Sequence, residues 1–171
     1  MSFDLATRNS FYIVVGDRTM KKFAAYRFVP EHRLTLEYFE GAIHLEDLMG
    51  FLQNMKNHDE YDPTYDVIID IWNLDTTIDE GAVRDYSQKV SGDTGFLAKR
   101  RCALLTRSPR QVVAATFVEL YGAKLPMEFQ VFHTFQAAVA WLDRPGFTLD
   151  NYNDHVKAMK QQKGKSSDLF Q

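Results

Sequence analysis

The spacing of apolar residues in the first 40 positions is typical of β-strands. Residues 11–15 and 23–29 are short runs rich in aromatic and β-branched side chains, which favour strands. Between residues 32 and 40, Leu34, Leu36 and Tyr38 recur at every second position, so they fall on one side of a third strand. Together these runs predict an antiparallel meander.

After residue 41 the apolar spacing changes to that of a helix, with Leu45, Leu48 and Leu52 on one stripe. Strand-like and helix-like segments then alternate, which requires right-handed crossovers and parallel strand pairs. The predicted fold class is therefore α/β, a single domain with a mixed sheet in which β-α-β-α-β-α units follow the meander. The predicted helices cover residues 45–57, 78–90, 109–121 and 135–142, and the later strands cover residues 66–72, 101–106 and 127–132.

Two capping boxes fix where predicted helices begin. Thr77 precedes Glu80 by three residues, and Ser108 precedes Gln111 by three residues with Pro109 at the first helical position. His44 occupies the N-cap position of the helix that starts at Leu45. Residues 1–150 are expected to form the α/β domain. Residues 151–171 are expected to be a polar, lysine-rich C-terminal tail with one or two helical turns and a partly disordered end.

Composition excludes several classes of protein. The 171 residues carry a formal charge of −3, which is too balanced for a broad nucleic-acid footprint. Cys102 is the single cysteine, so an internal disulfide is excluded and a reducing compartment is favoured. The N-terminal residues lack the pattern of a signal peptide, and no apolar run approaches the ~20 residues that span a bilayer. The expected location is the cytoplasm.

Residues capable of catalysis or metal binding occur without the spacing that those functions need. None of the five histidines is paired three or four positions from another, so no metal site is predicted. Cys102 lies in a predicted buried strand, where a small apolar role is the commoner one. Asp70 lies inside an apolar strand and needs hydrogen bonds, for which the loop 73–77 is the expected source. The basic run 99–101 is expected to be a solvated face. We therefore predict no catalytic residue and no cofactor.

The segments 67–74 and 78–81 resemble the strand-to-helix centre of SpoIIAA-like (STAS-like) domains, which include bacterial anti-anti-sigma factors. Further similar segments extend the resemblance over residues 10–143, within a broader group of uncharacterised bacterial proteins. The resemblance implies a SpoIIAA-like fold and a regulatory role. The family carries a phosphorylatable serine in an Asp-Ser-Ser-Gly pattern at the start of this helix, whereas Asp79 and Glu80 stand at the serine positions here.

The leading functional hypothesis is a non-catalytic regulatory or protein-interaction module. Its partner is expected to be another protein, with a second copy of the chain as a further option, and neither nucleic acid nor membrane insertion is expected. The candidate surface lies at the carboxyl end of the central strand, where open α/β sheets place ligands. It comprises Asn73, Asp75, Thr76, Thr77, Asp79, Glu80 and Arg84.

Two alternatives remain open at the level of sequence. The fold also resembles the lipid-binding CRAL-TRIO domain, which implies a carrier or sensor for a small apolar ligand. An enzyme is the third hypothesis, and it would require a cleft in which Asp70 and a histidine converge, with Cys102 as an optional third member.

Overall fold

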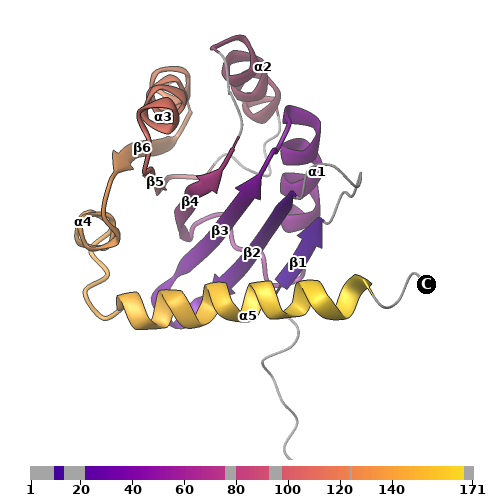
Figure 1. Cartoon of the computed structure of the whole chain (residues 1–171). Coiled ribbons are helices and arrows are strands. Elements are labelled where there is room, and N and C mark those ends of the chain that lie inside the picture. The colour runs from indigo at the N-terminus through magenta and orange to yellow at the C-terminus, as the bar shows by residue number, and fades with distance from the viewer. Residues whose placement is uncertain (1–9, 14–21, 76–79, 93–97, 124, 168–171) are drawn as a thin grey trace, which may run out of the picture.

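A six-stranded mixed sheet forms the centre of the computed structural model, which describes residues 10–13, 22–75, 80–92, 98–123 and 125–167 (Figure 1). The first three strands pair antiparallel, and the third to sixth pair parallel. The spatial order follows the chain. The predicted meander, the mixed sheet and the α/β class are thus confirmed. The strands are β1 (Ser10–Ile13), β2 (Phe23–Val29), β3 (Leu34–Gly41), β4 (Asp66–Leu74), β5 (Arg100–Leu105) and β6 (Met127–Phe132).

Helices cover both faces of the sheet. The connections between β3, β4, β5 and β6 cross in one direction, so right-handed crossovers place their three helices on one face. The last two helices pack on the other face, which the longest one crosses (Figure 1). The helices are α1 (Leu45–Lys56), α2 (Glu80–Ser91), α3 (Pro109–Gly122), α4 (Phe135–Trp141) and α5 (Leu149–Ser167), with a short 3-10 turn η2 at Pro30–His32.

Each face of the sheet has its own hydrophobic core, because successive strand residues point to opposite sides. Leu34, Leu36 and Tyr38 of β3 join the cluster under α4 and α5, as their alternation predicts. Phe39 joins the cluster under α1, which includes Phe51. Since both faces are covered, polar side chains in the middle of strands are buried as well. Among the described residues, the buried charged ones are Glu37, Asp66, Asp70 and Arg100.

Asp66 joins the amino edge of the sheet to the turn after α4. Its Oδ1 accepts a hydrogen bond from the backbone nitrogen of Arg101 at 2.8 Å. Its Oδ2 lies 3.2 Å from Nη2 of Arg101 and 3.0 Å from Nη2 of Arg144. A buried carboxylate needs such donors, so this cluster has a structural role.

The last helix is longer than the sequence predicts. The expectation of one or two helical turns was wrong, because α5 runs from Leu149 to Ser167 and buries Tyr152 and Met159 against the sheet. Its start is fixed by Thr148 and Asn151, each of whose backbone nitrogens donates to the other's side-chain oxygen, at 3.0 Å and 3.2 Å. The expected disordered end lies partly outside the described residues.

Candidate functional site

The candidate residues at the end of β4 are held by the neighbouring strand. Asn73 is exposed, and its Nδ2 donates to the hydroxyl of Tyr38 at 3.0 Å. Asp75 is exposed, and its backbone nitrogen donates to the carbonyl of Gly41 at 3.0 Å. Gly41 has φ 80°, a left-handed conformation that glycine adopts at no steric cost. Both residues therefore lie at the carboxyl edge of the sheet, as predicted.

The helical part of the candidate surface is linked to α3. Glu80 and Arg84 are exposed on the first turns of α2. The hydroxyl of Tyr121, at the end of α3, donates to Oε1 of Glu80, and this bond raises the pKa of Tyr121. The remaining candidates, Thr76, Thr77 and Asp79, lie outside the described residues, as does the first capping box apart from Glu80.

The second capping box is present and also connects α3 to the central strand. Gln111 nitrogen donates to Oγ of Ser108 at 3.3 Å, and Ser108 nitrogen donates back to Oε1 of Gln111 at 3.1 Å. Nε2 of Gln111 donates to the carbonyls of Trp72 and Leu74, at 3.2 Å and 3.1 Å. The start of α3 is therefore fixed at the same edge as Asn73.

A polar network that sequence reasoning missed lies beside Asn73. Tyr38 donates its hydroxyl hydrogen to Oε2 of Glu40 at 2.7 Å, and Nζ of Lys160 lies 3.0 Å from the same oxygen. The ammonium group of Lys160 also lies 4.7 Å from the centre of the Tyr38 ring. Only the three-dimensional structure reveals this network, because α5 was not expected to reach the sheet.

Asp70 of β4 makes a second polar contact between α5 and the sheet. Its Oδ1 accepts from the backbone nitrogen of Trp72 at 2.8 Å, and its Oδ2 accepts from the hydroxyl of Tyr152. Burial raises the pKa of Asp70, although both bonds oppose the shift. The loop 73–77 was the wrong source for these donors within the described residues, and the two bonds give Asp70 a structural role.

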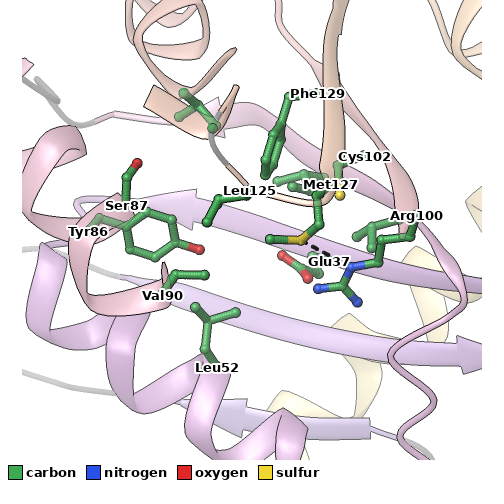
Figure 2. A pocket seen from close by; sticks show the side chains of 14 residues that line it. Glu37, Leu52, Tyr86, Ser87, Val90, Arg100, Cys102, Leu125, Met127 and Phe129 are labelled. Carbon is green, nitrogen blue, oxygen red and sulfur yellow. Dashed lines mark hydrogen bonds between the residues drawn. The ribbon is translucent and has the colours of Figure 1, made fainter. Parts of the chain in front are cut away.

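A small cavity lies on the opposite face, between the sheet and helices α1 to α3 (Figure 2). Its volume is about 30 Å³, whereas ligand pockets are ~300 Å³ or more. The walls are largely apolar, with Leu52 from α1, Val90 from α2 and Phe129 from β6. The described residues therefore leave room here for about two water molecules, since one needs ~10–15 Å³.

Polar groups from three elements nevertheless enter this cavity. Figure 2 shows the carboxyl group of Glu37 and the guanidinium group of Arg100 beneath the thioether of Met127, with the hydroxyl of Tyr86 pointing toward them. Nε of Arg100 lies 3.3 Å from Sδ of Met127. Burial raises the pKa of Glu37 to about 7, and the charge of Arg100 offsets only part of the shift.

The prediction for Cys102 agrees with the structure, whereas the prediction for its neighbour Arg100 does not. Cys102 is 2% exposed, and burial raises its pKa to about 12, which agrees with a small apolar role. Arg100 is 7% exposed, so the prediction that residues 99–101 form a solvated face was wrong for this residue. It was wrong because β5 begins at Arg100 and turns its side chain under α2 and α3.

The outward face of α3 carries exposed apolar side chains. Val113 is 55% exposed and Leu120 is 64% exposed, and their separation of two helical turns places them on one face. The opposite face of α3 is buried through Ala114 and Ala115. This apolar surface lies beside Tyr121 and hence beside the candidate residues of α2.

Comparison with known proteins finds similarity only among solved structures. No family model matches the chain, and no curated protein matches it. Among solved structures, the chain is similar to an uncharacterized protein of the DUF3478 family with a SpoIIAA-like fold, from Shewanella loihica PV-4. The two share 18% identity over 83% of this chain and 98% of that one, with a TM-score of 0.39. At this TM-score, the likeness bears on no residue role or activity.

Among the described helices, none is long and apolar enough to cross a membrane. Within the same residues, no group of three or more histidine, cysteine, aspartate or glutamate side chains is placed to hold a metal ion.

Proposed function

We propose that this protein is a non-catalytic interaction module that binds another protein through the α2–α3 surface, defined here as Glu80, Arg84, Val113 and Leu120. The observation that carries the proposal is the exposure of Val113 and Leu120 on one face of α3. An apolar centre beside charged residues is the composition of many protein interfaces. The surface also contains two residues of the candidate site found in the sequence.

The alternatives receive less support from the described geometry. A carrier of an apolar ligand needs a far larger cavity than about 30 Å³. The enzyme hypothesis placed Asp70 and a histidine in one cleft, with Cys102 as an optional third member. Asp70 contacts Tyr152 on the α5 face of the sheet, whereas Cys102 belongs to the cluster under α1. The sheet therefore separates the two side chains.

The first test compares the affinities with which matched variants bind the captured protein. The tagged protein is isolated gently from the cells that produce it, and native and denaturing masses are compared. Val113→Gln combined with Leu120→Gln should lower the affinity for the captured protein by on the order of tenfold or more, because two apolar contacts are lost. Glu80→Lys should weaken the same complex by reversing the charge beside the apolar face.

Leu149→Gln is the matched control, because Leu149 is an exposed apolar residue, 38% exposed, on α5 at the other face of the sheet. The control should retain the partner at wild-type affinity. A partner that binds all variants equally, or a non-covalent small molecule in place of a protein, would contradict the proposal. A mass of two chains that the α3 double variant reduces to one would identify the partner as a second copy.

A further inference from the structure

The guanidinium group of Arg100 has an unsatisfied donor inside the cavity under α2. Its Nε contacts Sδ of Met127, and it shares a side-chain hydrogen bond with Tyr61. Its Nη1 is fully buried and has no hydrogen-bond partner within the described part of the chain. A buried donor without a partner is energetically unfavourable, and more so when the group is charged. A water molecule or an ion in the adjacent space would supply the missing partner.

Glu37 lines the same cavity but does not supply the missing contact. In the described residues, Glu37 and Arg100 form no salt bridge, although both are more than nine-tenths buried. The guanidinium group keeps its positive charge at every physiological pH. When Glu37 is protonated, the cavity therefore holds one positive charge and no negative charge.

The other groups around Arg100 do not neutralise this charge. Tyr86 of α2, Tyr61 from the segment after α1 and Cys102 of β5 are all neutral at physiological pH, because their pKa values are raised by burial. The charge of Asp66 raises the pKa of Cys102. Asp66 does not neutralise Arg100, because it forms salt bridges with Arg101 and Arg144 on the other face of the sheet. The remaining walls, from α1, β4, α3 and β6, contribute no ionisable side chain to the cavity.

We propose that the cavity is a binding site for one small monovalent anion of about the size of chloride, held at Nη1 of Arg100 and taken up together with a proton on Glu37. The volume of about 30 Å³ accommodates such an ion and excludes larger organic anions. Two water molecules would also fit, but water would leave the buried charge uncompensated. A protonated Glu37 can in addition donate a hydrogen bond to the anion, whereas an ionised Glu37 repels it.

The direct test is crystallographic and uses bromide as the probe. Crystals of the full chain at about pH 5.5, below the pKa of about 7 of Glu37, are soaked in sodium bromide. We expect an anomalous peak within hydrogen-bond distance of Nη1 of Arg100. Density for water alone at this position, with bromide present at other sites on the protein, would overturn the proposal.

A solution measurement tests the coupling to the proton. At about pH 5.5, sodium chloride should raise the midpoint of thermal unfolding more than sodium gluconate at equal ionic strength, because a ligand that binds only the folded state stabilises it. At about pH 8.5 this difference should disappear, since Glu37 is then ionised. Equal midpoints in the two salts at about pH 5.5 would also overturn the proposal.

The variant Glu37→Gln separates the anion from other salt effects. Its neutral amide cannot repel the anion, so the difference between chloride and gluconate should persist at both pH values. Glu128→Gln is the matched control, because Glu128 is exposed on β6, and it should behave as the wild type. A chloride effect that still vanishes at about pH 8.5 in Glu37→Gln would exclude Glu37 as the coupled group. This inference is independent of the proposed docking surface, which lies on the outer side of α3.

Discussion

Two buried carboxyl groups at opposite faces of the sheet differ in how they are satisfied. Asp70 accepts hydrogen bonds from Trp72 and Tyr152, which lower its pKa and so oppose the effect of burial. For Glu37 only the charge of Arg100 opposes burial, and its pKa rises to about 7. The difference follows from position: Asp70 lies at the carboxyl edge, where α5 brings a donor, whereas Glu37 lies over a cavity. Ionisation of Glu37 in the folded protein is therefore unfavourable.

The ionisation of Glu37 should make the protein less stable as the pH rises. Its pKa increases from 4.5 in the unfolded chain to about 7 in the folded protein, so the folded state binds the extra proton between these values. The free energy of unfolding should thus fall by about 3 kcal/mol between about pH 4.5 and pH 7, at 1.36 kcal/mol for each unit of pKa, and level off above. Urea unfolding across this range, in gluconate buffer, measures the change.

In Glu37→Gln the same measurement should give a flatter profile. Two groups contribute residual slopes of opposite sign in the variant, because burial raises the pKa of Asp70 and lowers the pKa of His155. Profiles of wild type and variant that run parallel across the whole range would show that Glu37 ionises normally in the folded state.

The sequence predicts the face of the sheet on which Glu37 lies, but it does not predict that Glu37 and Arg100 are buried. The alternation along residues 34–39 places Glu37 opposite Tyr38, and the structure confirms it. It does not reveal that helices cover both faces, so neither the burial of Glu37 nor that of Arg100 could be derived. The cavity is lined by residues of β3 and β5, which are far apart in the chain, and no local pattern encodes their proximity.

At the scale of elements, α5 shows why a polar sequence can still form a packed helix. Tyr152, Val156 and Met159 recur at intervals of four and three residues, so one narrow apolar stripe faces the sheet. The rest of the helix is polar, and its lysines obscure the stripe when composition alone is considered. A helix that contacts the core along a single line needs no wider apolar face.

The caps of α1 and α3, in contrast, were predicted correctly at His44 and Ser108 because capping is local.

Two adjacent residues of α5 should respond differently to truncation. Met159 is fully buried, so Met159→Ala should lower the free energy of unfolding by about 2–5 kcal/mol. Lys160 is exposed and pairs with Glu40, so Lys160→Ala should cost at most about 1 kcal/mol. Urea unfolding at constant pH measures both values. Two small and equal effects would indicate that α5 does not pack on the sheet in solution.

At the scale of the whole molecule, the sequential strand order determines where a site can form. The order from β3 to β6 proceeds in one direction, whereas doubly wound sheets open a ligand crevice where the order reverses. The fold class could be predicted from the alternation of strands and helices, but the placement of the candidate surface relied on that crevice rule. The six described strands contain no such reversal, which is consistent with a function at the outer helices.

The same strand order leaves β6 at an edge of the sheet, where free backbone groups invite pairing with another chain. Oε1 of Glu119, on α3, accepts the hydrogen bond of the Val131 backbone nitrogen at 2.9 Å and so occupies one of these groups. In Glu119→Ala the Val131 amide should exchange its hydrogen faster, and sedimentation at rising concentration should reveal more self-association than in wild type. Glu128→Ala, which removes an exposed carboxylate from β6 itself, should change neither. If both variants associate alike, loss of surface charge is the cause, and the contact from Glu119 does not protect the edge.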